Sequence, residues 1–268
     1  MKKEIAKRVR FGVRLKLISV VLGLGAILLG VSLFVIYDGY KKFVFSEQTK
    51  KLEDVSKLIV ERIESEFTNL RYHLSFVASH NKVLIDAVEK ADAAYAGSSE
   101  EETLRHLKEI DASWNGAEGE QLRKRLLKNE AAAVLKDLII MSNLPISEIF
   151  ITDRIGAEVA ASQKTTDYYQ ADEMWWQKAF NNGKGAYYFS GLEYDESSHV
   201  YAFTIACPVK NFRGDVIGVL KAVVDKDLSL KRIFHIFLGQ GGLAGVMSAR
   251  GVDIFHLSFG SKAVDRKV

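Results

Sequence analysis

The chain has a single cysteine, Cys207, among its 268 residues. One cysteine excludes an internal disulfide framework and any metal site built from several cysteines. Cys207 lies in the apolar run of residues 203–209, which predicts a buried side chain that packs as a small hydrophobe. We therefore expect no covalent or metal cross-link in this fold.

The sequence also lacks the motifs that carry common enzyme chemistry. The segment 183–185, Gly-Lys-Gly, is too short for a phosphate-binding loop and has no Ser or Thr partner after it. No serine stands in a Gly-x-Ser-x-Gly pattern. His73 and His80 are seven residues apart, without acids or further histidines at metal-ligand spacing. The sequence predicts no enzyme activity, no cofactor and no metal.

Positive charge is in surplus only in the first sixteen residues. The formal net charge is +3, but residues 1–16 hold seven Lys and Arg against one acid, Glu4, whereas the rest holds thirty bases against thirty-three acids. Without a basic body, the chain is not expected to bind nucleic acid. The tail is instead typical of a cytoplasmic flank that is attracted to anionic membrane lipid.

A run without any charge follows the tail. Residues 17–37 read LISVVLGLGAILLGVSLFVIY. At about 1.5 Å per helical residue this run reaches roughly 30 Å, the thickness of a bilayer's hydrocarbon core. The positive-inside rule then predicts a cytoplasmic tail and an extracytoplasmic body that begins at residue 38. A cleaved signal peptide is the alternative, but the run is longer than a usual signal core and no small-x-small site follows it.

Small residues line one face of the predicted membrane helix. Their spacing is i, i+4, i+7 and i+11, at Ser19, Gly23, Ala26 and Gly30. Small residues so placed let two membrane helices approach closely. We therefore expect a homodimer formed through the transmembrane helix and the long helix after it. The alternative is that small residues are simply common in membrane helices.

Residues 38–80 carry apolar side chains every three or four positions, which predicts a long helix with one apolar stripe. The stripe consists of Leu52, Val55, Ile59, Ile63, Phe67, Leu70, Leu74 and Val77. Residues 82–143 continue as shorter helices, with a capping box at Ser99 and Glu102. The last of these helices is predicted to run from 121 to 142.

After residue 145 the spacing of apolar residues changes from helical to alternating. Strands are predicted at 149–152, 158–162, 186–190, 200–209 and 216–225. A short helix is predicted between the second and third strands, with Asp172 as its N-cap, Asn182 at its end and Gly183 just beyond. Another helix is predicted to begin near Leu228. The predicted fold class is α+β: a transmembrane helix, a long helix and an antiparallel sheet.

Three segments carry a family resemblance: 150–162 (FITDRIGAEVAAS), 166–176 (TDYYQADEMWW) and 208–220 (PV, then GDVIGVL). With the order of tail, membrane helix, long helix and sheet, they resemble the double Cache sensor domains of bacterial transmembrane receptors. The resemblance implies a PAS-like sheet module and the start of a second module. The implied domains are a basic tail, a membrane helix, a long helix, a membrane-distal module and a truncated membrane-proximal module, at 1–16, 17–37, 38–80, 81–238 and 239–268.

The same resemblance implies a ligand pocket beside an aromatic pair. Amino-acid-binding members of the family carry the pattern Tyr-x-x-x-Arg-x-Trp-Tyr there, with an Asp at the end of a later strand. In this chain Tyr169, Trp175, Trp176 and Asp225 take the matching places, but Glu173 stands where the family has Arg. Because that Arg holds a ligand carboxylate by a bidentate pair, Glu173 puts ordinary amino-acid recognition in doubt.

Aromatic and acidic residues gather around this segment, and acids among aromatic faces suit a cation. Lys221 shares a strand face with Asp225, and it could neutralise Glu173 or hold an anion, so the ligand's charge stays open. The alternative is that the tryptophans are core and the acids only balance a helix N-terminus. The predicted ligand-binding residues are Tyr168, Tyr169, Asp172, Glu173, Trp175, Trp176, Tyr188, Lys221 and Asp225.

The function implied is that of an extracytoplasmic, small-molecule-sensing input domain of a membrane-bound signal transduction protein, either a chemotaxis receptor or a sensor histidine kinase. The expected ligand is small and bears an amine or another cation. The expected location is the inner or plasma membrane, in the front end of a longer protein. A membrane-anchored extracytoplasmic binding or scaffold protein without an output module is the alternative, and an anchored hydrolase is a third.

Overall fold

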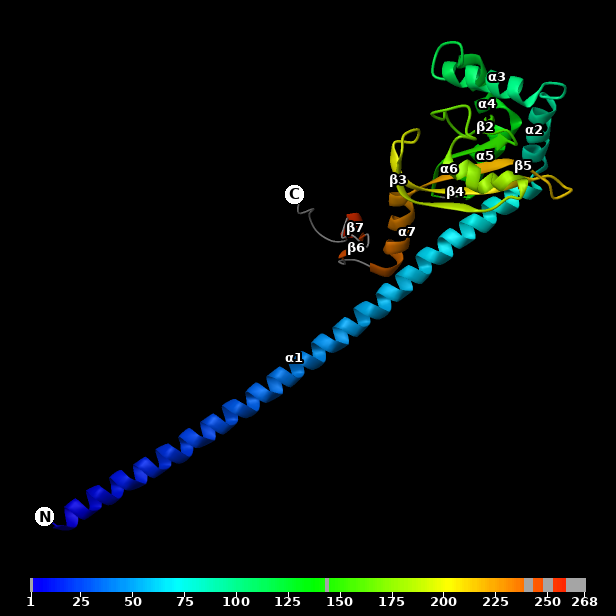
Figure 1. Ribbon diagram of the computed structural model, residues 1–268. Helices are drawn as coiled ribbons and strands as arrows, with labels where there is room; N and C mark the ends of the chain where they lie inside the picture. Colours follow the sequence, from blue (N-terminus) through cyan, green and yellow to red (C-terminus); the bar gives the residue numbers. More distant parts are fainter. Residues whose placement is uncertain (1, 143–144, 239–242, 248–252, 259–268) are drawn as a thin grey trace. The chain divides into compact units, whose positions relative to one another are not determined.

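The computed structural model describes residues 2–142, 145–238, 243–247 and 253–258. Helix α1 runs without interruption from Lys2 to His80 (Figure 1). The predicted membrane segment, residues 17–37, is exposed along its whole length. Among the described residues, α1 is the one helix whose length and composition suffice to cross a bilayer. The chain divides into two compact units, residues 1–58 and 59–268.

The second unit confirms the C-terminal part of the predicted apolar stripe. Leu70 and Leu74 on α1 are buried, and they join one hydrophobic cluster with residues of the sheet. In the first unit the stripe is not covered, since Leu52 is 69% exposed and Val55 36% exposed. The stripe therefore packs on this chain's own sheet only in its later turns.

Four shorter helices follow: α2 Lys82–Ala93, α3 Glu100–Ser113, α4 Glu120–Lys128 and α5 Glu130–Ser142. The capping box of Ser99 and Glu102 is confirmed at the start of α3. The single helix predicted from 121 to 142 is wrong, because Asn129 has an extended backbone and its side chain accepts the N–H of Ala132. The predicted helix break at 143–144 lies outside the described residues.

The sheet has five antiparallel strands in the order β2-β1-β5-β4-β3. The strands are β1 Ile146–Asp153, β2 Glu158–Ala161, β3 Tyr188–Asp195, β4 Val200–Lys210 and β5 Val216–Asp225. The α+β class is therefore confirmed. The predicted third strand, 186–190, is wrong in extent, because pairing with β4 continues to Asp195.

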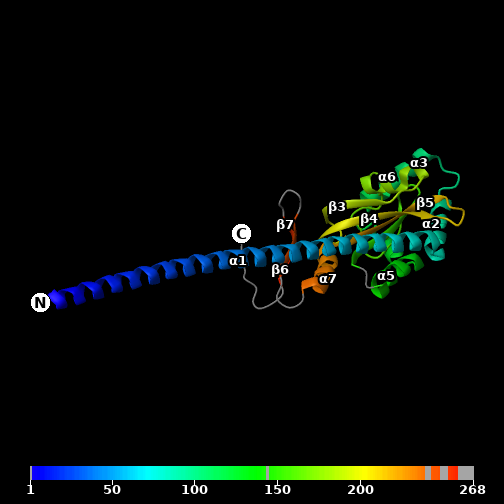
Figure 2. The ribbon, with the colours of Figure 1, turned by 90° about the horizontal axis from the view of Figure 1, so that it is seen from below.

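The two faces of the sheet carry different layers. One face packs on α1, α2 and α5 through side chains such as Ile151 and Leu220. Cys207 lies in this layer; burial raises the pKa of its thiol to about 11, which confirms its prediction as a buried hydrophobe. The other face packs on α6, Met174–Phe180, through Phe150 and Val219. Figure 2 shows α5 and α6 on opposite sides of the sheet.

Helix α6 begins two residues later than the sequence predicts. Glu173, not Asp172, takes the N-cap position, and it makes no side-chain capping bond. The predicted end at Asn182 is also wrong, because Asn181 and Asn182 have positive φ values of 49° and 52°. Residues in this left-handed region end an α-helix, so Gly183 closes a short 3-10 turn instead.

The last described elements are α7, Lys226–Leu238, and a separate hairpin of β6, Leu243–Met247, and β7, Asp253–Ser258. Helix α7 begins two residues before the predicted Leu228. The predicted pair of strands is confirmed, whereas the segment 239–242 before them and the turn at 248–252 lie outside the described residues. The assignment of 239–268 to a second module stays a prediction.

The turn between β1 and β2 depends on Asp153 and Gly156. One carboxylate oxygen of Asp153 accepts the N–H groups of Ile155 and Ala157, both at 2.9 Å. Gly156 has φ +94°, and a Cβ built there would lie 2.5 Å from the Cβ of Ala171. Glycine is thus required here both by backbone conformation and by the close approach of the segment before α6.

We predict that Gly156→Ala lowers the free energy of unfolding by about 2–4 kcal/mol, from the left-handed backbone and the clash with Ala171 together. Gly97→Ala is the matched control, because Gly97 has φ +93° and an added methyl group would meet no atom within 4 Å. That variant should lose only about 1–2 kcal/mol. Urea unfolding measures both, and equal losses would contradict the close approach.

Candidate ligand-binding site

A polar cavity of about 680 Å³ lies on the sheet face that carries α6. Its walls come from residues 164–173, between β2 and α6, and from residues 193–199, around the β3–β4 hairpin. Its floor includes Thr204 of β4 and Lys221 of β5, and Trp175 of α6 stands at one side. The volume falls in the range of small-molecule sites in proteins.

Strand register brings the hairpin acids to this face. Glu193 pairs with Ala202, and Asp195 pairs with Val200. Residues two apart on a strand share a face, so Glu193 and Asp195 point to the same side as Ala202 and Thr204. The Asp195 carboxylate accepts bonds from the Ser197 hydroxyl and from the N–H and hydroxyl of Ser198, at 2.7–2.9 Å. The hairpin tip is therefore fixed by one of the cavity's own acids.

Helix α3 and the residues just after it fix the other wall. The carboxylate of Asp111 accepts the N–H groups of Tyr168 and Tyr169 at 2.8 and 3.0 Å. The indole N–H of Trp114 donates to the carbonyl of Thr165, and the Asn115 amide donates to the carbonyl of Thr166. These bonds anchor the backbone on both sides of Asp167, whose side chain faces the cavity.

Negative charge dominates the lining. Two lysines, Lys164 and Lys221, stand against five carboxylates, those of Asp167, Glu173, Glu193, Asp195 and Glu196. The Lys221 ammonium lies 3.8 Å from Asp195, and 5.1 and 5.4 Å from the ring centres of Trp175 and Phe150. Its charge is thus already engaged by a carboxylate and two aromatic faces. The remaining acids leave the cavity suited to a cation.

The carboxyl groups of the cavity differ in how readily they ionise. Burial raises the pKa of Asp167 and of Glu173, and neighbouring acids add to the rise. Burial alone would raise the pKa of Asp195 too, but bonds from Ser198 and the charge of Lys221 outweigh it and hold that pKa below its usual value. A bound cation would stabilise the ionised forms of Asp167 and Glu173.

Three of the nine residues predicted from the sequence line this cavity: Glu173, Trp175 and Lys221. They come from the start of α6 and from the middle of β5, about fifty positions apart in the chain. The structure therefore brings together the departure from the family pattern, Glu173, and the lysine that was expected to neutralise it. Lys221 does oppose the rise in the pKa of Glu173.

The aromatic residues among the other six pack elsewhere. Tyr168 is buried against Trp114, with ring centres 5.5 Å apart, and Tyr169 packs on the edge of the same cluster. The Trp176 indole N–H donates to the Thr152 hydroxyl at 2.8 Å. Tyr188 packs half-buried against the cluster that contains Trp176. Each of these side chains has a structural role at its observed place.

The two remaining acids also lie away from the lining. Asp172 is exposed just before α6. Asp225 ends β5, and its carboxylate accepts the N–H groups of Asp227 and Leu228 at 2.7 and 3.0 Å, so it caps α7. Asp167, Glu193, Asp195 and Glu196 were not predicted as ligand-binding residues. The alternation of Glu193 and Asp195 was the available signal, but it was lost when β3 was ended at 190.

Comparison with protein-family models and with curated proteins finds no match. Solved structures similar to this chain include the sensor domain of the Vibrio cholerae histidine kinase DctB, with 15% identity, 78% of this chain and 68% of that chain covered, and a TM-score of 0.45.

Two further similar structures are complexes of the ligand-binding domain of the Campylobacter jejuni chemoreceptor Tlp3. The complex with 4-methylisoleucine has 15% identity, covers 74% of this chain and 66% of that chain, and has a TM-score of 0.40. The complex with L-valine has 14% identity, coverages of 72% and 73%, and a TM-score of 0.37. These similar structures are sensor domains, but at such scores the function has to be argued from the cavity.

We predict that Asp225→Ala lowers the free energy of unfolding by about 1 kcal/mol, because α7 loses its N-cap, and that Asp225→Asn retains most of the stability. Neither change should alter ligand binding at the polar cavity. Urea unfolding and a binding titration on the same preparations test this. Full stability of Asp225→Ala together with lost binding would return Asp225 to the site.

Proposed function

We propose that this chain is the extracytoplasmic, small-molecule-sensing input part of a membrane-bound signal transduction protein, of the chemotaxis-receptor or sensor-histidine-kinase kind. The observation that carries the proposal is the 680 Å³ polar cavity, built on the sheet face opposite α1. The long apolar segment of α1 supports a membrane anchor. The chain binds its ligand and does not convert it.

The ligand carries an amine or another cation. Five carboxylates face the cavity against two lysines, and Lys221 is already engaged by Asp195. Glu173 would repel a carboxylate, whereas Trp175 offers an aromatic wall to a cation. The membrane-distal sensing module then corresponds to the predicted segment 81–238.

The N-terminus lies in the cytoplasm and the body from residue 38 lies outside. The basic tail, residues 1–16, supports this orientation and an attraction to anionic lipid. The chain forms a homodimer through its membrane segment and long helix. The exposed Leu52 and Val55 on α1 support the second contact, because they continue the stripe without a partner on the described part of the chain.

We predict that the full chain in lipid nanodiscs is stabilised by an amine in a thermal-shift screen of amines, amino acids and organic acids, because a ligand that binds only the folded state raises its stability. Asp167→Asn should weaken that binding by about 1.5–3 kcal/mol, the range for a bond to a charged group. Asp172→Asn is the matched control, since Asp172 is an exposed aspartate of the same segment that does not line the cavity.

The same binding should weaken as the pH falls. The pKa of Asp167 and of Glu173 is raised in the folded protein, so protonation removes their charges at a higher pH than in the unfolded chain. Equal effects of Asp167→Asn and Asp172→Asn, or tighter binding of the amine at lower pH, would contradict the cation site. Conversion of the amine by purified protein would favour a hydrolase.

We predict that protease added to intact spheroplasts digests the body and spares a tag on the N-terminus, as the positive-inside rule requires. Permeabilised spheroplasts, in which the tag should also be lost, are the control. Release of a soluble body that lacks residues 1–37 would instead identify a cleaved signal peptide.

The alternative of a binding or scaffold protein without an output module differs only beyond this sequence. Reading the gene past codon 268 separates the two. A second apolar span followed by kinase or chemotaxis signalling motifs would support a transducer, and their absence would support the alternative.

A further inference from the structure

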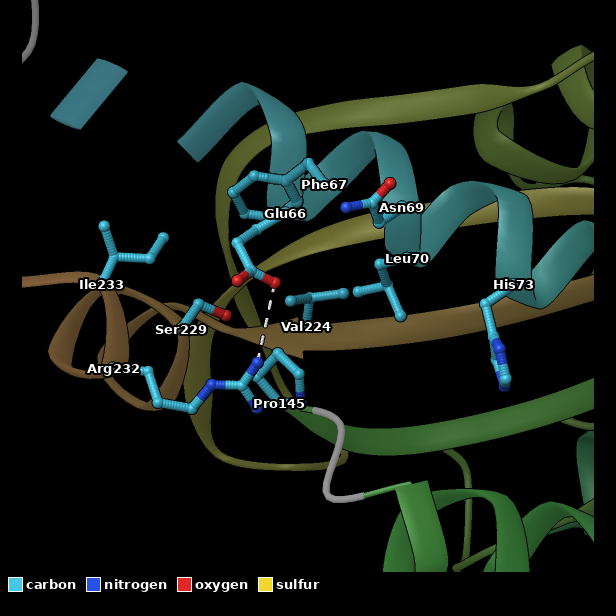
Figure 3. A pocket seen from close by; sticks show the side chains of 10 residues that line it. All are labelled: Glu66, Phe67, Asn69, Leu70, His73, Pro145, Val224, Ser229, Arg232 and Ile233. Carbon is cyan, nitrogen blue, oxygen red and sulfur yellow. Dashed lines mark ion pairs between the residues drawn. The ribbon is translucent and has the colours of Figure 1, made fainter. Parts of the chain in front are cut away.

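A second cavity, of about 210 Å³, lies on the opposite face of the sheet from the polar cavity. It is bounded by α1, by α7 and by the ends of β1 and β5 (Figure 3). Phe67 and Leu70 of α1, Val224 of β5 and Ile233 of α7 give it apolar walls. Neither the sequence pattern nor the function proposed above assigns a role to this cavity.

One buried hydroxyl at this cavity has no partner. Ser229 of α7 is 6% exposed, and its Oγ makes no hydrogen bond to any described residue. Figure 3 shows this hydroxyl directed from α7 toward Val224 and the space under α1. A buried hydroxyl without a partner is unfavourable and uncommon in folded proteins. A polar group of a bound molecule would satisfy it.

The charges at the rim are already balanced. Glu66 of α1 lies 3.6 Å from Arg232 of α7, and its other oxygen lies 2.5 Å from Arg62 (Figure 3). Bringing an ionised group next to apolar walls is unfavourable unless an opposite charge is there to receive it. The rim pair offers a neutral surface to an incoming molecule. The cavity therefore favours a ligand without net charge.

We infer that this cavity binds a small neutral amphiphile, with a compact apolar body and one hydroxyl, carbonyl or amide group directed at Ser229. A serine hydroxyl can both donate and accept, so each of these groups can pair with it. An apolar cavity of roughly 150 Å³ holds a benzene ring in another protein, so this one has room for a ring and one polar substituent. The inference does not rest on the sensing function, because the two cavities share no residue.

Four one-ring probes separate the contributions: benzyl alcohol, toluene, benzoate and benzylamine. Each is titrated against the full chain in lipid nanodiscs, and unfolding is followed by tryptophan fluorescence, since all three tryptophans lie in the second unit. Benzyl alcohol should stabilise the protein most, toluene less, and the two ions least. Because every variant shares the same lipid, partition of the probes into the bilayer cancels between them.

Ser229→Ala should weaken benzyl alcohol about five- to tenfold, the loss of one hydrogen bond, and leave toluene unchanged. Without ligand the variant should be at least as stable as the parent chain, because its unpartnered hydroxyl is gone. Ser190→Ala is the matched control: Ser190 is also buried, but its hydroxyl is bonded to Gly191 and Thr204. That variant should lose stability and keep its affinity for benzyl alcohol.

Asp167→Asn, at the polar cavity, should leave benzyl alcohol binding unchanged, which keeps failure of this inference distinct from failure of the sensing function. The inference is overturned if no probe stabilises the chain, if benzoate or benzylamine binds as tightly as benzyl alcohol, or if Ser229→Ala binds benzyl alcohol as the parent chain does.

Discussion

The pairing register of β5 with its two neighbours is the constraint on which both cavities depend. Lys221 stands opposite Phe150 of β1 and opposite Ala206 of β4. A shift of one residue would turn every side chain of β5 to the other face. Lys221 would then enter the layer under α1, and Leu220 would face the polar cavity. The register thus separates an apolar helix-covered face from a charged ligand-facing one.

This register also explains why local sequence signals succeeded where they did. The apolar stripe of α1, the capping box at Ser99 and the buried Cys207 each depend on neighbours three or four residues away or on one apolar run. They were predictable and are confirmed. The extents of β3 and α6 depend instead on pairing with β4 and on two asparagines with positive φ, which no periodicity reports.

The candidate site was less predictable for the same reason. Glu173, Trp175 and Lys221 were found because they stand in or beside a recognisable motif, whereas Glu193 and Asp195 reach the cavity only through the hairpin's register. Asp225 fitted the motif but serves as a helix cap, because α7 begins directly after β5. The unpartnered Ser229 has no sequence signature at all, since burial and a missing partner are tertiary properties.

The central claim is that the polar cavity, not the helix-covered face, receives the signal molecule. Hydrogen–deuterium exchange on the full chain in nanodiscs, with and without the stabilising amine, tests it most directly. The account predicts slower exchange in residues 164–173 and 193–199, the two walls of the cavity, with smaller changes elsewhere. Unchanged exchange in both walls at a saturating amine concentration would contradict it.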